Sequence, residues 1–263
     1  MTVELAERYH RDGVVSQVEI LTPTEAAEHR ASMEKAEKVL GNLHYRDKVH
    51  TVLSSAWDLC IHRTVLDAVE AMIGPDILVY NATYIIKEPG AKAFVAWHQD
   101  LTYWGLEDHD AQVSMWLALS PATAESGCMS MIPGSHLDGW QKHVEDNSDD
   151  NVLLLGQRIE NVDPANQQLY PLQSGQASFH HGWTVHTSNP NVSEERRIGL
   201  NVQYLAPHNR QVGVDASAIL VRGTDTYGYF TADTPPASNL DSDAVARWHD
   251  VEQRMKQGFQ TRD

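Results

Sequence analysis

The segment QVSMWLALS, residues 112–120, predicts a β-strand whose two faces differ in character. Successive side chains along a strand point to opposite sides of the sheet. One face would carry large aliphatic groups, and the other would carry hydroxyl, small or aromatic groups. The first set is Val113, Met115, Leu117 and Leu119, and the second is Ser114, Trp116, Ala118 and Ser120. Such a strand is typical of a two-layer β architecture with a distinct interior.

Further segments on both sides of this strand have a similar character. They are short, rich in β-branched and aromatic residues, and separated by Gly, Pro, Asn or Asp, which predicts strands. These segments are ILVYNATYIIKE (77–88), FVAWHQD (94–100), GCMSMIP (127–133), QASFHHGWTVHTS (176–188) and RIGLNVQYLAP (197–207).

Helices are predicted before and after these strands. In residues 22–41, Thr22 and Glu25 have capping-box spacing, and Gly41 is a stop signal. Residues 62–74 place their apolar side chains on one stripe, and residues 241–258 read as a closing helix. The sequence therefore predicts one mainly β domain with flanking helices, built as a β-sandwich or jelly roll. We expect N-terminal helices in residues 1–75, the β core in residues 76–210, and a lid and C-terminal helix in residues 211–263.

The composition limits the possible partners. The chain has 263 residues, with 20 Lys and Arg against 36 Asp and Glu, a formal net charge of −16. Such a surface repels phosphate backbones and anionic lipids, which argues against nucleic acid and membrane as partners. We find no apolar segment long enough to span a bilayer and no secretory signal pattern. Two cysteines are too few for a cysteine-based metal site and suit a reducing cytoplasm, where we expect the protein to reside.

His98 and Asp100 lie two residues apart in FVAWHQDLTYWG, residues 94–105. On a strand these positions share a face, so both side chains could reach one metal ion. Two histidines and one carboxylate form a facial triad that leaves coordination positions open on iron(II). With 14 histidines in the chain, a chance pair is easy to find, and hydrogen-bonded core groups are the alternative.

Candidates for the third ligand cluster in residues 178–204. This segment holds His180, His181 and His186, followed by Arg196 and Arg197 in a strongly acidic chain. Alternation along the predicted strand puts Gly199, Asn201 and Gln203 on the face of Arg197. A guanidinium fixed on the inner face is a ready bidentate partner for a carboxylate, whereas we expect Arg196 to be exposed.

Four motifs make the chain resemble the phytanoyl-CoA dioxygenase family of Fe(II)- and 2-oxoglutarate-dependent oxygenases. They are WHQD (97–100), SGCMSMIPGSH (126–136), HTSNPNVSEERR (186–197) and RIGLNVQY (197–204). The resemblance runs from YHRDG at residues 9–13 to RGTDTYGYF at residues 222–230. It implies a double-stranded β-helix core, the jelly roll of cupin-like proteins.

The resemblance also implies residue roles. His98, Asp100 and His186 would be the metal ligands, and Arg197 would bind the far carboxylate of 2-oxoglutarate with help from Ser188. Trp116 falls where the family places an aromatic residue beside the co-substrate, with plain core packing as the alternative. His180 and His181 are expected to be neighbours of the site rather than ligands, and His136 a turn-stabilising group.

The implied reaction uses Fe(II), 2-oxoglutarate and O₂ to hydroxylate an unactivated C–H bond, with release of succinate and CO₂. Relatives that halogenate have Gly or Ala in place of the metal carboxylate, so Asp100 argues against halogenation here. Desaturation, epoxidation and ring chemistry share the same ligand set and stay open.

Asn81, Tyr103 and Trp104 are the expected substrate-binding residues. Asn81 would face inward from a neighbouring strand, and the two aromatic residues follow the His-x-Asp pair in a loop. Shielding of the metal is the alternative role for the aromatic pair. Residues 222–230 could form a lid or only a surface turn. We expect a small or medium metabolite as substrate rather than an acyl-CoA, because no Lys/Arg cluster is evident for the coenzyme A phosphates.

Two other classes of function compete with this reading. One is a cupin-type metalloenzyme that uses no keto-acid and therefore has no need of Arg197. The other is a non-enzymatic jelly-roll binding module whose histidine and aspartate side chains are structural. The sequence does not predict an oligomeric state.

Overall fold

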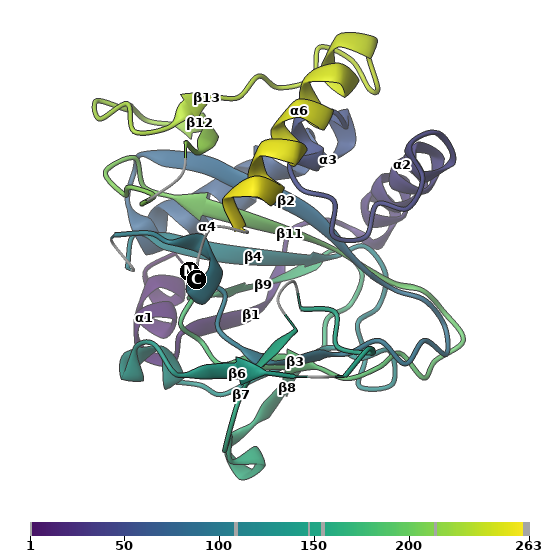
Figure 1. Cartoon of the computed structure of the whole chain (residues 1–263), viewed down its shortest axis with the longest axis vertical. Coiled ribbons are helices and arrows are strands. Elements are labelled where there is room, and N and C mark those ends of the chain that lie inside the picture. Colours follow the sequence, from purple (N-terminus) through teal and green to yellow (C-terminus); the bar gives the residue numbers. More distant parts are fainter. Residues whose placement is uncertain (1, 108–109, 147, 154–155, 213–214, 260–263) are drawn as a thin grey trace.

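A computed structural model describes residues 2–259, apart from residues 108–109, 147, 154–155 and 213–214. The chain is mainly β with helices on its periphery (Figure 1). The α-helices are α1 (Thr2–Asp12), α2 (Pro23–Leu40), α3 (Ser54–Cys60), α4 (Arg63–Ile73), α5 (Leu101–Trp104) and α6 (Ser242–Phe259). Short 3₁₀ helices are η1 (Val49–Thr51), η2 (Ser135–Asp138) and η3 (Pro164–Asn166).

The strands form two main sheets and one pair. The large sheet has the order β1 (Val14–Glu19), β9 (Gln176–His180), β4 (Gln112–Ala118), β11 (Arg197–Leu205), β2 (Ile77–Lys87), β12 (Ser217–Arg222) and β13 (Thr231–Ala232). The smaller sheet has the order β3 (Val95–His98), β10 (His186–Ser188), β5 (Met129–Met131) and β8 (Gln168–Tyr170). Strands β6 (His143–Glu145) and β7 (Gln157–Ile159) pair with each other. Figure 1 shows the large sheet across the middle and the smaller sheet below it.

The two faces of β4 differ as its sequence predicts. Val113, Met115 and Leu117 belong to the main apolar core, which also takes in the buried stripe of α4. Trp116 and Ala118 belong to a second cluster, formed with side chains of the smaller sheet. The large sheet is therefore covered by helices on one face and faces the smaller sheet on the other. This confirms a mainly β jelly-roll core with flanking helices.

The predicted helix signals are also confirmed. The Thr22 hydroxyl accepts a hydrogen bond from the backbone N–H of Glu25 at 3.3 Å, and the Glu25 carboxylate accepts one from the Thr22 N–H at 2.8 Å. Gly41 and Gly74 end α2 and α4 with φ of 79° and 98°, a region in which glycine alone is unstrained. None of the helices in the described residues is both long and apolar enough to cross a membrane.

Residues 176–188 differ from the single strand that the sequence suggests. The chain leaves the large sheet after β9, turns at residues 181–185, and enters the smaller sheet as β10. The turn is closed by a hydrogen bond from the Thr184 N–H to the His181 carbonyl at 2.8 Å. Gly182 packs so closely that a β-carbon there would lie 2.4 Å from Cγ of Leu101. This crossing places β9 and β10 on opposite sides of one pocket.

Candidate active site

A pocket of about 260 Å³ opens between the two sheets. Both sheets and the segments that connect them line it. The nine site residues expected from the sequence all lie in its wall, namely Asn81, His98, Asp100, Tyr103, Trp104, Trp116, His186, Ser188 and Arg197. The structure therefore brings together positions that are more than 100 residues apart in the chain.

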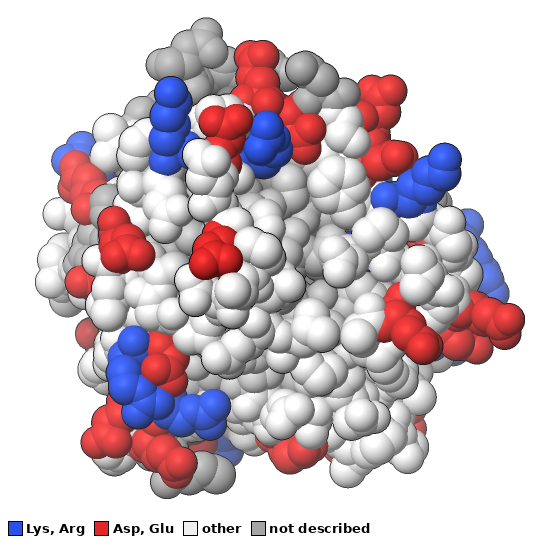
Figure 2. All heavy atoms as spheres, turned by 90° about the horizontal axis from the view of Figure 1, so that it is seen from below, with Lys and Arg blue, Asp and Glu red and all other residues white. Residues whose placement is uncertain are grey.

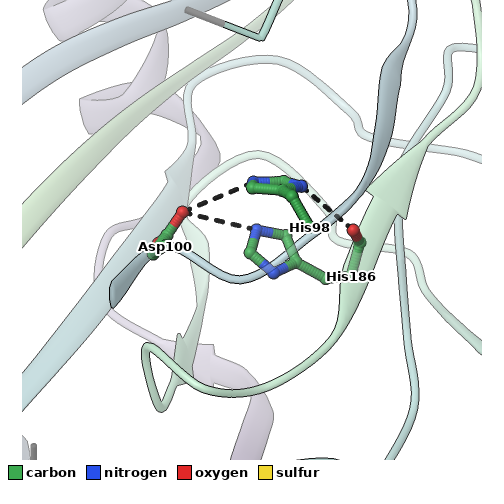
Figure 3. A group of neighbouring side chains, drawn as sticks. All are labelled: His98, Asp100 and His186. Carbon is green, nitrogen blue, oxygen red and sulfur yellow. Dashed lines mark hydrogen bonds and ion pairs between the residues drawn. The ribbon is translucent and has the colours of Figure 1, made fainter. Parts of the chain in front are cut away.

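Three of these side chains form a compact donor group. One nitrogen each of His98 and His186 and one oxygen of Asp100 lie within 4.8 Å of one another. The Asp100 Oδ1 lies 3.4 Å from Nε2 of His98 and 3.7 Å from Nε2 of His186. Figure 3 shows the carboxylate pointing at both imidazole rings. His98 and His186 pair directly across β3 and β10, which fixes their rings side by side.

The hydrogen bonds of the two histidines suit metal binding. Nδ1 of His98 lies 2.9 Å from the Ala96 carbonyl, and Nδ1 of His186 lies 2.9 Å from the Thr184 carbonyl. Because a carbonyl oxygen only accepts, each Nδ1 carries the proton and each Nε2 presents its lone pair to the group. Burial, followed by the nearby His98 ring, lowers the pKa of His186 well below its ordinary value, which keeps it neutral.

Asp100 reaches this group from a position that strand alternation does not predict. Strand β3 ends at His98, and Asp100 has helical dihedral angles (φ −57°, ψ −44°) as the residue that precedes α5. Its other oxygen, Oδ2, accepts from the Ser114 hydroxyl at 3.0 Å and lies 3.3 Å from Nε2 of His180. Burial raises the pKa of Asp100, but the His180 hydrogen bond and the His186 and His98 rings outweigh it and lower the pKa well below the ordinary value. Oδ1 is therefore the carboxylate oxygen that faces His98 and His186 in the donor group.

Arg197 is a buried cation without an acidic partner among the described residues. Its side chain is 1% exposed, donates from Nη1 to the Gly127 carbonyl at 2.6 Å, and lies 5.0 Å from the Trp116 ring. The Nε atom has no hydrogen-bond partner among the described atoms. Burial lowers the pKa of Arg197 to about 10, so it stays charged at neutral pH. A buried guanidinium in this state fits a carboxylate ligand.

Lys87 is a second buried basic side chain, and it was not singled out from the sequence. It faces Arg197 across β2 and β11, and its side chain donates to the Ser188 hydroxyl at 2.8 Å and to the Ser188 carbonyl at 3.0 Å. Burial and then the charge of Arg197 lower the pKa of Lys87 to about 6. The sequence could have indicated this position, because Lys87 and Asn81 are six residues apart on β2 and therefore point to the same face of the sheet. Ser188 thus connects Lys87 to the end of the pocket that holds Arg197.

The remaining histidines fall outside the donor group. His180 holds Asp100, and His181 lies 3.5 Å from the exposed carboxylate of Asp110. Nε2 of His136 lies 3.1 Å from the His10 carbonyl, and a β-carbon on Gly13 would lie 2.4 Å from its Nδ1. His136 therefore ties the turn after β5 to the end of α1.

Asn81 is held near the middle of β2, six residues before Lys87. Its side chain donates to the Asp47 carboxylate at 2.8 Å and accepts from the backbone N–H of Lys48 at 2.8 Å. Asp47 also lines the pocket, and nothing in the sequence singled it out. Tyr103 and Trp104 lie on α5, and Trp104 packs against Tyr80 with ring centroids 6.5 Å apart.

Residues 222–230 contain an exposed turn. The Asp225 carboxylate accepts from the backbone N–H groups of Tyr227 and Gly228 at 2.8 and 3.0 Å. The rings of Tyr227 and Tyr229 are about half exposed. Only Phe230 reaches inward, where its ring packs 6.2 Å from that of Tyr80.

Comparison with known proteins points to one family. A family model described as phytanoyl-CoA dioxygenase (PhyH) matches residues 9–199. A Caenorhabditis elegans protein named phytanoyl-CoA dioxygenase domain-containing protein 1 homolog is 31% identical over 136 residues, 50% of this chain and 47% of that protein. A Stutzerimonas stutzeri protein named probable alpha-ketoglutarate-dependent hypophosphite dioxygenase is 30% identical over 146 residues, 54% of this chain and 50% of that protein. The chain spans about half the length of these curated relatives.

Solved structures extend the likeness over nearly the whole chain. The apo form of ThoJ, described as a non-heme monooxygenase, matches with a TM-score of 0.87 and 32% identity over 97% of each chain. Its nickel complex matches with a TM-score of 0.82 and 31% identity, covering 97% of this chain and 98% of that one.

Proposed function

The chain belongs to the phytanoyl-CoA dioxygenase family, and from this premise we propose that it is an Fe(II)- and 2-oxoglutarate-dependent oxygenase. It hydroxylates an unactivated C–H bond of a small or medium metabolite, with release of succinate and CO₂. One observation carries the proposal. The same pocket contains a two-histidine, one-carboxylate donor group and a buried guanidinium with no acidic partner among the described residues.

His98, Asp100 and His186 are the residues that would hold the metal. Two imidazoles with fixed tautomers and one carboxylate suit iron(II) and leave positions open for other ligands. When bound, Fe(II) with 2-oxoglutarate and O₂ supplies the oxidising power for C–H cleavage. His180 and Ser114 hold the second oxygen of Asp100, which prevents the carboxylate from rotating away from the metal position. The related nickel complex of ThoJ supports metal binding by this fold.

Arg197 and Lys87 would hold the far carboxylate of 2-oxoglutarate. The Arg197 Nε–H is without a partner among the described atoms, and Lys87 lies on the same face of the neighbouring strand. A carboxylate placed between them restores the proton of Lys87, because a nearby negative charge raises its pKa from about 6. Trp116 packs against the guanidinium and keeps it aimed along the pocket. The Stutzerimonas stutzeri relative is named as alpha-ketoglutarate-dependent, which supports 2-oxoglutarate as the co-substrate.

The pocket favours a small or medium substrate over an acyl-CoA. Its volume is about 260 Å³, and 2-oxoglutarate would take part of that space. Figure 2 shows one face of the molecule, on which the basic side chains lie in small groups beside acidic ones. Among the described residues of that face, no continuous basic patch is offered to the phosphates of coenzyme A. Asp100 fills the position that a halide would need, so hydroxylation is favoured over halogenation.

The test is an anaerobic titration of the Fe(II)-loaded protein with 2-oxoglutarate. Chelation of Fe(II) by the keto-acid gives a weak visible charge-transfer band, which we expect for the wild type and not for Arg197→Ala at the same concentration. Arg196→Ala is the matched control, because it removes the same charge from the neighbouring residue, and its band should persist. Iron binding without a band in the wild type would favour a cupin-type enzyme without keto-acid. Failure to bind iron would favour a binding module.

A further inference from the structure

Four side chains form one row across the pocket face of the large sheet. The register pairs His180 with Ser114, Ser114 with Gln203, and Gln203 with Asn81. These residues come from β9, β4, β11 and β2, which are neighbours in that order. Strands lie about 4.8 Å apart, so Ser114 and Asn81 are separated by about 10 Å.

A carboxylate is bound at each end of this row. Asp100 accepts from His180 and Ser114 at one end and belongs to the metal-ligand group. At the other end Asp47 accepts through Oδ1 from the Asn81 amide at 2.8 Å and from the Thr83 hydroxyl at 3.3 Å. Its second oxygen, Oδ2, has no hydrogen-bond partner among the described residues. The two acids thus face one pocket from opposite sides.

Asp47 has no cationic partner among the described residues, although cations flank it in the chain. Arg46 pairs with Glu252, and Lys48 pairs with Asp233 at 2.9 Å. Lys48 also donates to the backbone carbonyls of Tyr80 and Ser217. Both neighbouring charges are therefore engaged elsewhere. Burial raises the pKa of Asp47, although the hydrogen bonds from Asn81 and Thr83 and the charge of Lys48 lower it, so burial of the carboxylate outweighs its present partners.

Aromatic side chains also line the pocket. Tyr80 precedes Asn81, and Trp104 packs against Tyr80. Both belong to the pocket wall. A carboxylate among aromatic faces recognises an organic cation by charge and by cation–π attraction together.

2-Oxoglutarate cannot account for Asp47. Its cationic anchors, Lys87 and Arg197, lie six residues along β2 and β11 from Asn81 and Gln203. Among the described residues Asp47 is held by Asn81 and Thr83 and forms no ion pair with either cation. An anion would moreover be repelled by Asp47.

We propose that Asp47, held by Asn81 and Thr83, is the substrate anchor and binds a positively charged nitrogen of the substrate across the pocket from the metal ligands. This rests on the proposed function. The substrate class is an organic ammonium or comparable nitrogen cation, whose reacting carbon lies several bonds from the charge because Ser114 and Asn81, which hold Asp100 and Asp47, are about 10 Å apart.

The test uses a panel of small primary amines and quaternary ammonium compounds, each matched with an uncharged isostere. Thermal stabilisation of the zinc-loaded protein with 2-oxoglutarate reports binding, and succinate release from the iron-loaded protein reports turnover. We expect the wild type to prefer the charged member of each pair. Asp47→Asn should weaken its binding by about tenfold or more, since a hydrogen bond to a charged group contributes about 1.5–3 kcal/mol. Asp12→Asn, at an exposed ion pair with Arg11, is the control.

A second variant guards against loss of folding. Thr83→Val keeps the charge of Asp47 and removes one hydrogen bond to it, so a severalfold weakening is expected. Equal binding of charged and neutral isosteres by the wild type, or unchanged selectivity in Asp47→Asn, overturns the proposal. The two proposals fail separately. If the 2-oxoglutarate band is absent but ammonium compounds still bind in a way that depends on Asp47, the oxygenase proposal is refuted and the role of Asp47 is supported. If the band is normal but ammonium compounds are not preferred, the role of Asp47 is refuted and the oxygenase proposal is supported.

Discussion

Two buried lysines in this fold are in opposite electrostatic settings. Lys48 is 1% exposed and its ammonium lies 2.9 Å from the Asp233 carboxylate, at the edge where β12 joins the sheet. Lys87 is 2% exposed, lies beside Arg197, and donates to Ser188 and Asn189 but to no acidic group among the described residues. An unpaired buried charge is costly, whereas a paired one can hold a framework. The difference separates a charged lysine that stabilises the fold from a lysine that gains its proton when an anionic ligand binds.

The largest effect on stability is expected for Lys48→Met. The change leaves Asp233 buried without its partner, which typically costs about 3–5 kcal/mol of the free energy of unfolding. Denaturant unfolding of the metal-free protein measures it. The double variant Lys48→Met/Asp233→Asn should recover part of the loss, because it removes the orphaned charge. A loss below about 1 kcal/mol in the single variant would show that this pair does not hold the framework.

Arg197→Ala should show the opposite pattern. Removing one partner of a buried charge pair costs about 2–5 kcal/mol in binding, so the affinity for 2-oxoglutarate should fall by about 30-fold or more. Stability should change less than in Lys48→Met, because the guanidinium has no acidic partner among the described residues to leave behind. Calorimetric titration of the zinc-loaded protein measures affinity without turnover. Equal losses of stability in the two variants would remove the distinction between them.

Much of the fold could be predicted from local patterns. The period-2 alternation of β4 and β11 assigned their inner and outer faces, and Thr22, Glu25, Gly41 and Gly74 marked helix ends. These signals are local, since each depends on backbone geometry within a few residues. The spacing of His98 and Asp100 was informative for a different reason than the one supposed, because Asp100 lies in the turn beyond β3.

What could not be predicted depends on long-range register. The crossing from β9 to β10 between the two sheets follows from close packing at Gly182, which no local pattern reveals. The row from His180 to Asn81 needs three strand pairings at once. Lys87 was passed over because a lysine at the end of a strand is normally exposed. Asp47 lies in a loop without periodicity, so only the folded chain shows its carboxylate in the pocket.

The pKa of Lys87 predicts a pH dependence of co-substrate binding. The value of about 6 lies below that of an unfolded lysine, so the folded chain binds fewer protons and the Lys87 contribution to stability rises with pH above 6. A bound carboxylate raises the pKa of Lys87, so 2-oxoglutarate binding takes up a proton. Affinity should therefore fall as pH rises from 6, by up to about tenfold per unit. Titrations from pH 6 to about 8.5 should show this slope in the wild type and a flatter one in Lys87→Met.

The smallest effect is expected for Arg196→Ala, although Arg196 adjoins Arg197 in sequence. Strand alternation sends the two guanidinium groups to opposite sides, and Arg196 pairs with Glu37 at 3.0 Å and Glu88 at 2.8 Å. Its side chain is 24% exposed, so its ion pairs contribute about 0–1 kcal/mol to stability. Affinity for 2-oxoglutarate should be unchanged. If Arg196→Ala instead weakened 2-oxoglutarate binding as much as Arg197→Ala, the pocket would be responding to total positive charge. The argument from a fixed, unpaired guanidinium would then fail, because charge alone does not distinguish the two arginines.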